Sequence, residues 1–264
     1  MSAVLAEIEN LSVAYRTENG RTAALSQVDL AIEAGKRLAV IGESGSGKST
    51  LALAITDLLP NDALVEGEIA WPGLPHLPAP GRDIGFVFQD PGASLDPVLS
   101  IGEQIAEVAK NHLGFGWREA YIHACDLLER VRIPQPEAAL RAYPHQLSGG
   151  QRQRVAIAVA IAAQPKLLIA DEPTSALDTI VQREIVSLLD RLVSESGMAL
   201  LFITHDIALA SGFADAVAVF HESRLVEAGA ADEGLSRPSR AYTRLLIDSH
   251  IDLATPPLIE GAQA

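Results

Sequence analysis

A glycine-rich stretch, GESGSGKST at residues 42–50, carries the residue types that bind nucleotide phosphates. It fits the pattern G-x-x-x-x-G-K-[ST], in which the glycines let backbone N–H groups wrap the phosphates. Lys48 supplies a positive charge to the β- and γ-phosphates, and the Ser49 hydroxyl is a ligand for Mg²⁺. The whole stretch is therefore predicted to bind a nucleotide through Gly42, Glu43, Ser44, Gly45, Ser46, Gly47, Lys48, Ser49 and Thr50.

Two adjacent acids follow a second apolar run, in KLLIADEP at residues 166–173. The run predicts a buried strand that brings Asp171 to its C-terminal end, where ligands bind in open α/β sheets. An acid at this position holds Mg²⁺ in P-loop NTPases, so Asp171 joins Ser49 as a predicted metal ligand. Glu172 lies next to it and is predicted to act as base or orienter for the attacking water. Together the two motifs predict ATP hydrolysis with Mg²⁺.

A second candidate anion site lies in YPHQLSGGQRQR, residues 143–154. Ser148 is a good helix N-cap, and Gln151 three residues later completes a capping box. Gly149 and Gly150 then leave bare N–H groups at a helix N-terminus, which binds anions. Because the first stretch already binds this chain's nucleotide, the second is predicted to serve the nucleotide of another chain.

The elements that must position these residues alternate in type. The opening third contains the strand-like runs AEIENLSVAY and ALSQVDLAIEAG and then RLAVIG, and a helix from Lys48 stops at Pro60. Residues 72–81 are rich in Pro and Gly and predict an exposed loop. After the strand DIGFVFQD, residues 98–142 predict a helical insertion, and strands KLLIAD and ALLFIT then alternate with helices before a hairpin, AVAVFHESRLVEAG. This order predicts an α/β fold with a parallel sheet.

Composition limits the function classes. The chain has 264 residues, 48% of them hydrophobic, and a net charge of −14, which disfavours nucleic acid and anionic lipid as partners. Cys125 is the only cysteine, so it forms no internal disulfide and builds no cysteine zinc site. The start lacks a secretory-signal pattern, and the longest apolar run, residues 155–163, is about half a membrane span. We expect a soluble cytoplasmic chain that reaches a membrane only through a partner.

In combination, the motifs resemble the ATP-binding subunits of ABC transporters. The resemblance runs in the family's order from about Tyr15 to Glu227. Its motifs are the P-loop, LSGGQ at 147–151, LLIADE at 167–172, SALD at 175–178 and ITHD at 203–206. It implies a P-loop NTPase (RecA-like) core with a parallel sheet and an N-terminal antiparallel β portion, within residues 1–90 and 160–235. A helical subdomain with the signature motif would span 91–159, and a tail with one short helix would span 236–264.

The resemblance also implies roles for single residues. Two such cassettes pair head to tail, so Ser148 and Gly150 would reach the γ-phosphate held by the partner's P-loop. Gln89 would contact the magnesium and sense the membrane subunit, and His205 would steady the γ-phosphate and the attacking water.

Two further residues receive a role only through the resemblance. Asp178 would cross the dimer interface, and Tyr15 would stack on the adenine ring.

Longer stretches, such as GFVFQDPGASLDPVLSIGEQIAE, are similar to the peptide and nickel import subfamily. The tail departs from that subfamily, with SRAYT in place of its usual His-Pro-Tyr-Thr and without a cysteine-rich end. The similarity implies a peripheral ATPase on the cytoplasmic face of the cell membrane, powering uptake of a peptide, metal chelate or similar solute. Its partners would be two transmembrane permease subunits, a second cassette and an extracytoplasmic solute-binding protein. For the second cassette, the similarity favours a different subunit.

Three alternatives stay open at this point. An exporter ATPase would carry the same motifs. ABC-type ATPases that act on nucleic acid have a long coiled coil or two cassettes in one chain, which this acidic chain lacks. A P-loop switch protein would need neither Glu172 nor LSGGQ. The sequence does not identify the transported solute. It also does not show whether the two cassettes are identical.

Overall fold

The N-terminal strands form a small antiparallel sheet with one buried face. In the computed structural model, which describes residues 3–18, 20–175, 177–236 and 238–251, β1 (Val4–Thr17) lies between β2 (Gly20–Glu33) and β4 (Leu64–Ala70). Inward side chains such as Ile8 and Leu11 are almost fully buried. The first two strands match the expected runs. β4 was not predicted, because its sequence LVEGEIA is half polar and its side chains are mostly exposed.

A second sheet carries the predicted parallel core. Its strand order is β5-β6-β7-β3-β8-β9, and every neighbouring pair is parallel except β8 with β9. The predicted α/β fold with a parallel sheet is thus confirmed, as is the C-terminal hairpin. The strands are β3 (Arg37–Gly42), β5 (Ile84–Val87), β6 (Leu167–Asp171), β7 (Ala199–Thr204), β8 (Ala216–His221) and β9 (Arg224–Ala230).

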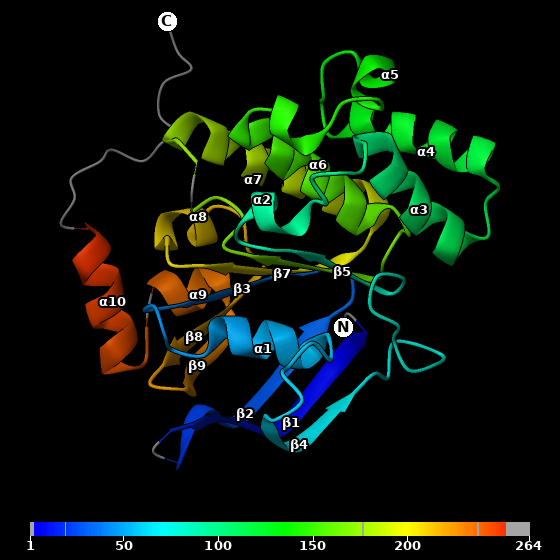
Figure 1. Cartoon of the computed structure of the whole chain (residues 1–264). Coiled ribbons are helices and arrows are strands. Elements are labelled where there is room, and N and C mark those ends of the chain that lie inside the picture. The colour runs from blue at the N-terminus through cyan, green and yellow to red at the C-terminus, as the bar shows by residue number, and fades with distance from the viewer. Residues whose placement is uncertain (1–2, 19, 176, 237, 252–264) are drawn as a thin grey trace, which may run out of the picture.

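Helices cover both faces of this sheet (Figure 1). α1 (Lys48–Ile55) and the antiparallel sheet lie on one face, and α6 (Gly149–Ile161) and α7 (Thr179–Ser196) lie on the other. Strand side chains alternate accordingly: Leu168 and Ala170 pack toward α6 and α7, whereas Leu167 and Ile169 pack toward α1.

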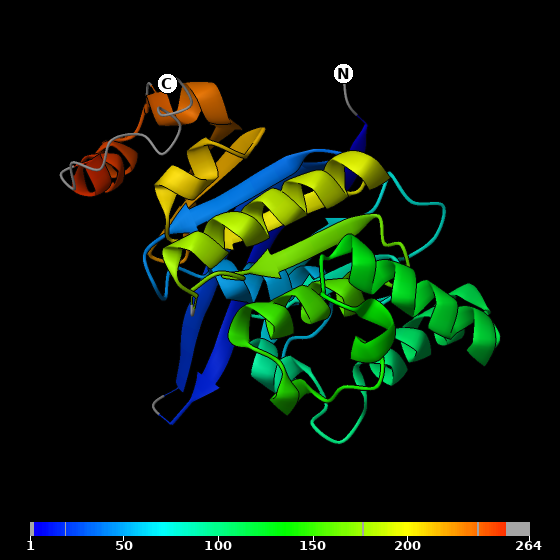
Figure 2. The ribbon, with the colours of Figure 1, turned by 90° about the horizontal axis from the view of Figure 1, so that it is seen from above.

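The expected helical insertion consists of short helices that lie to one side of α7 (Figure 2). They are α2 (Pro91–Ser94), α3 (Ile101–Leu113), α4 (Trp117–Arg130), α5 (Pro136–Ala139) and the 3₁₀ turn η1 (Pro144–Gln146). The last helices are α8 (Ile207–Ser211), α9 (Ala231–Ser236) and α10 (Ala241–Ile251), of which α10 matches the predicted tail helix. The Pro-Pro end of the tail lies outside the described residues. None of the helices that the structure describes has the length and apolar character needed to span a bilayer.

α1 is shorter than the sequence suggested. The helix was expected to continue to Pro60, but it ends at Ile55. The Thr56 hydroxyl donates back to the Ala52 carbonyl at 2.9 Å, and Asp57 takes a left-handed conformation with φ 55°. The apolar residue Leu58 therefore leaves the helix and is 46% exposed.

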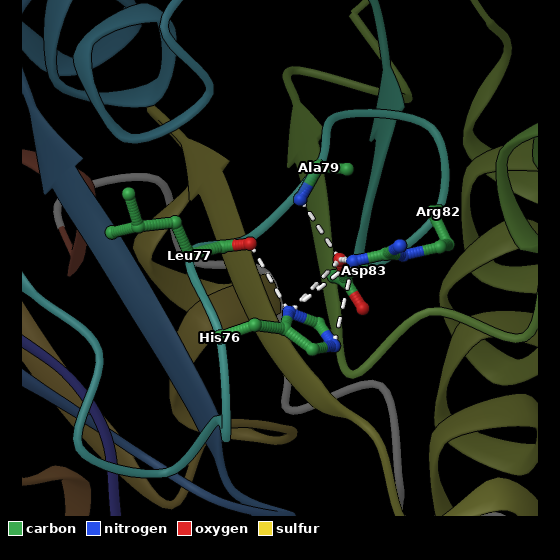
Figure 3. Close-up of polar contacts among 5 residues, drawn as sticks. All are labelled: His76, Leu77, Ala79, Arg82 and Asp83. Carbon is green, nitrogen blue, oxygen red and sulfur yellow. Dashed lines mark hydrogen bonds and ion pairs between the residues drawn. The ribbon is translucent and has the colours of Figure 1, made fainter.

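The proline-rich loop before β5 is fixed by one carboxylate (Figure 3). Asp83 Oδ2 accepts the Ala79 amide at 2.8 Å and the Arg82 guanidinium at 2.8 and 2.9 Å. The same guanidinium lies 3.2 Å from His76 Nδ1. Burial raises the pKa of Asp83, but the hydrogen bonds from Arg82 and Ala79 hold it below its ordinary value. The loop thus has a defined shape although it contains neither helix nor strand.

Candidate functional site

The P-loop connects the central strand β3 to α1 through glycines that the geometry requires. Gly42 has φ 149°, and a Cβ there would lie 2.2 Å from the Phe220 carbonyl oxygen. Gly47, the N-cap of α1, has φ 105°, and a Cβ would lie 2.4 Å from the Ala24 oxygen. Larger residues at either position would push the loop off its neighbouring strands, so the glycines keep the backbone amides at the helix N-terminus.

Lys48 lies inside this loop. Its side chain is buried, and its ammonium donates to the carbonyl oxygens of Gly42 at 2.9 Å and Glu43 at 2.7 Å. Burial lowers the pKa of Lys48, and the nearby carboxylates of Glu172 and Asp171 oppose that shift. The charge of the predicted phosphate-binding lysine is therefore held next to the two predicted acidic residues.

The two predicted metal ligands from the P-loop and β6 face each other. The Ser49 hydroxyl faces the carboxylate of Asp171, whose pKa is raised by burial and partly lowered again by Ser49. Asp171 Oδ1 is buried and has no hydrogen-bond partner among the described residues. In the described ranges, no group of three or more His, Cys, Asp or Glu side chains is arranged to hold a metal ion without further ligands. A pair of oxygen ligands suits Mg²⁺, which keeps waters and nucleotide phosphates as its other ligands.

The Glu172 carboxylate contacts two polar side chains that follow the neighbouring strands β5 and β7. Its Oε2 accepts the Gln89 Nε2 at 3.3 Å, and its Oε1 lies 3.5 Å from His205 Nδ1. Gln89, Glu172 and His205 follow β5, β6 and β7, which are adjacent in the sheet, so their side chains converge at one edge. Glu172 has φ 44°, and its amide donates to the Ile203 carbonyl at 3.0 Å. The structure thus brings the three predicted catalytic side chains together.

The second candidate anion site, residues 148–151, is the N-terminal end of α6 and is closed by a capping box. We refer to it as the second cradle, and to the P-loop at residues 42–50 as the first. Ser148 Oγ accepts the Gln151 amide at 3.3 Å, and Gln151 Oε1 accepts the Ser148 amide at 2.9 Å. Figure 1 shows α6 and α1 on opposite faces of the sheet. In the part of the chain that the structure describes, no hydrogen bond joins residues 148–151 to residues 42–50. The structure does not bring the two cradles together within one chain.

The start of α7 lies beside the second cradle. Asp178 caps this helix by accepting the Val181 amide at 3.0 Å. A Cβ added to Gly150 would lie 2.9 Å from Val181 Cγ1, and one added to Gly149 would lie 3.8 Å from Leu177. Gly149, Gly150 and Asp178 therefore form one surface at the two helix starts.

The remaining predicted residue, Tyr15, lies at the other end of the P-loop. Its half-buried side chain donates to the Thr50 hydroxyl at 3.3 Å, from β1 to the first turn of α1. Sequence reasoning missed Tyr242 of α10, which faces Glu43 from the C-terminal end of the chain. Tyr242 belongs to no motif, and the sequence distinguishes it only as an aromatic residue in the predicted tail helix.

The chain is similar to known transport proteins over nearly its full length. It is 41% identical to the oligopeptide transport ATP-binding protein OppD of Bacillus subtilis, over 98% of this chain and 73% of the relative. It is also 41% identical to the peptidoglycan transport ATP-binding protein YejF of Agrobacterium fabrum, over 97% of this chain. The chain spans only 50% of that second relative.

A solved structure has the same fold. The dimeric post-hydrolysis state of the ATP-binding cassette MJ0796, bound to ADP and Pi, superposes with a TM-score of 0.74 at 29% identity. The alignment covers 86% of this chain and 99% of that cassette. The family model described as ABC transporter matches residues 25–175, from β2 through the P-loop, LSGGQ and Glu172. The chain belongs to the ABC transporter family, and its fold is that of an ABC ATPase cassette.

Proposed function

We propose that this chain is the ATP-hydrolysing subunit of an ABC importer that takes up peptides or similar small solutes. The observation that carries the proposal is the convergence of Gln89, Glu172 and His205 beside Lys48 and Asp171. A protein that used nucleotide only as a switch would not need this arrangement. The names of the relatives support a transport role and favour peptides as the solute class.

Hydrolysis in this site depends on positioning and charge. Lys48 and the P-loop amides bind the phosphates, and Ser49 with Asp171 would hold Mg²⁺, which neutralises charge on the β- and γ-phosphates when bound. Glu172 accepts a proton from the attacking water. Gln89 and His205 contact its two carboxylate oxygens and so orient it, while their exposed positions let them respond to the nucleotide and the partner subunits.

The second cradle is assigned to the nucleotide of a partner cassette. Ser148 is exposed, and the amides of Gly149 and Gly150 begin α6 away from the P-loop of the same chain. The dimeric assembly of MJ0796 supports a paired state for this chain. In such a pair, the head-to-tail arrangement would complete each ATP site with the other chain's helix start.

An apolar groove is the proposed docking site for a permease subunit. It encloses about 190 Å³ between the end of α1, the proline-rich loop, β5, α3 and α6. Its lining includes Leu58, Phe88, Val108 and Val159. Phe88 directly precedes Gln89, so permease side chains packed into the groove would lie beside the residue that contacts Glu172. The loop fixed by Asp83 forms one wall through Pro80 and Gly81.

A cross-linking experiment tests this docking face. Cysteines at Leu58 or Phe88, in a Cys125→Ala background, are expected to cross-link to a permease subunit because both side chains line the groove and are partly exposed. Leu245→Cys on α10, 63% exposed, is the matched control. Capture from Leu245→Cys alone would place the docking face elsewhere.

The importer proposal is tested by purifying the tagged full-length chain from membranes and identifying its partners by mass spectrometry. We expect two permease subunits, a second cassette and an extracytoplasmic solute-binding protein, with this chain on the cytoplasmic face. Radiolabelled peptide uptake by the reconstituted complex then tests the solute class. Permease subunits without a binding protein, together with substrate efflux, would instead establish an exporter.

A further inference from the structure

The C-terminal helix α10 is anchored to the nucleotide-binding core by a carboxylate of β9. Glu227 accepts the Ser239 amide and hydroxyl, each at 2.8 Å, and the Arg240 amide at 3.3 Å. Burial raises the pKa of Glu227, but the polar groups of Thr243, Ser239 and Arg240 that face it lower the pKa further than burial raises it. Leu246 is buried with Ile41 of β3 and other residues of the same apolar cluster. The start of α10 is therefore fixed in place.

This anchoring holds Tyr242 against the strand beside the P-loop. The Tyr242 ring stacks on the His221 ring, with centroids 3.7 Å apart and planes 25° from parallel. His221 ends β8, and the preceding residue, Phe220, pairs with Gly42 at the end of β3. The stacked rings thus lie one strand away from Gly42, the first residue of the P-loop.

The polar end of Tyr242 faces Glu43. The Tyr242 hydroxyl is buried and makes no hydrogen bond of ordinary geometry within the described residues. Burial raises its pKa, and the Glu43 carboxylate raises it further while the Glu43 amide lowers it. The carboxylate and the amide of Glu43 thus both face the hydroxyl.

Glu43 is also the residue that holds Lys48. Its carbonyl oxygen accepts the Lys48 ammonium at 2.7 Å, and the Gly42 carbonyl accepts it at 2.9 Å. A change in the Glu43 backbone would move one of the two acceptors that fix this charge. The Tyr242 hydroxyl therefore faces the residue whose carbonyl helps to fix the Lys48 ammonium.

We infer that Tyr242 is a positioning residue for nucleotide binding, acting through Glu43 on the P-loop and Lys48. α10 then supports the ATP site from outside the family's matched segment, which ends at residue 175. The inference rests on the nucleotide site described above and adds a residue that touches neither the phosphates nor Mg²⁺.

The test measures ATP affinity of the full-length chain by titration with a fluorescent ATP analogue. Tyr242→Ala removes the ring stack and the contact with Glu43, and we expect it to weaken binding about tenfold. Tyr242→Phe keeps the stack and removes only the hydroxyl, so we expect a smaller loss of about threefold. Leu245→Ala, on the exposed face of the same helix, should leave the affinity within about twofold of wild type.

A double-mutant cycle separates positioning from a general loss of stability. If Tyr242 acts through Glu43, Tyr242→Phe should have little further effect on ATP affinity in a Glu43→Ala background, and unfolding temperatures well above the assay temperature would show that every variant is folded when affinity is measured. Additive effects on affinity, or a Tyr242→Phe variant with wild-type affinity, would overturn the inference. Lys48→Ala distinguishes this failure from a wrong nucleotide site: if that variant also binds ATP normally, the P-loop assignment itself fails.

Discussion

Replacing Glu172 with glutamine should abolish steady-state ATP hydrolysis and leave ATP binding intact. The amide keeps the size of the side chain and its contacts with Gln89 and His205, but it cannot accept a proton from the attacking water. Loss of a general base lowers the rate by about 10²- to 10⁴-fold. Phosphate release by the purified complex measures the rate, and fluorescent-ATP titration measures binding.

Two control variants sharpen this experiment. Glu66→Gln changes an exposed acid of β4 and should hydrolyse ATP like wild type. Lys48→Ala should weaken binding itself, because it removes the positive charge from the P-loop. A Glu172→Gln variant that retained more than about 10% of the wild-type rate would exclude Glu172 as the general base.

Ser148→Arg in this chain alone should stop hydrolysis at the partner's P-loop and spare the chain's own site. An arginine side chain would fill the helix start where the partner's γ-phosphate is proposed to bind. Loss of one donor to developing charge typically lowers the rate about 10²- to 10³-fold, roughly 3–4 kcal/mol. The complex needs a distinguishable partner cassette. Trapping with vanadate and photoreactive 8-azido-ATP then reports each site separately.

Ser148 is a better position for this test than Gly150. The Ser148 side chain is exposed, whereas a Cβ on Gly150 would lie 2.9 Å from Val181 Cγ1 and disturb the packing of α6 on α7. Ser148→Thr keeps a capping hydroxyl and should preserve trapping at both sites. If Ser148→Arg removed trapping only from its own chain's P-loop, the second cradle would act in cis and the head-to-tail arrangement would be wrong.

Short motifs between a strand and a helix predict the parts of the candidate site that depend on neighbouring residues. These are the P-loop glycines, Lys48 and the acids at the end of β6, and their roles stay predictions. The contact of Gln89 and His205 with Glu172 depends on β5, β6 and β7 being adjacent, and strand order cannot be read from periodicity. Only the resemblance to a family pointed to these two residues.

The structural differences from the sequence predictions also have physical causes. Leu58 and Leu59 continue the apolar pattern of α1, but the backbone turns at Asp57 once the buried face of the helix has ended at Ile55. Tyr242 could not be found from local pattern, because the residue that it faces, Glu43, lies about 200 residues earlier in the sequence. Contacts of this kind require the tertiary structure.

The helix caps next to the site have a mechanical consequence. Gln89 directly precedes Asp90, whose carboxylate caps α2 by accepting the Gly92 amide at 2.8 Å. His205 likewise precedes Asp206, which caps α8 by accepting the Leu209 amide at 3.1 Å. Uncapping a helix costs about 1 kcal/mol, so a shift of the backbone at Gln89 or His205 is expected to carry the neighbouring helix along. We therefore expect a backbone shift beside Glu172 to displace α2 or α8, so that a change in the ATP site would be transmitted to the surface that these two helices form.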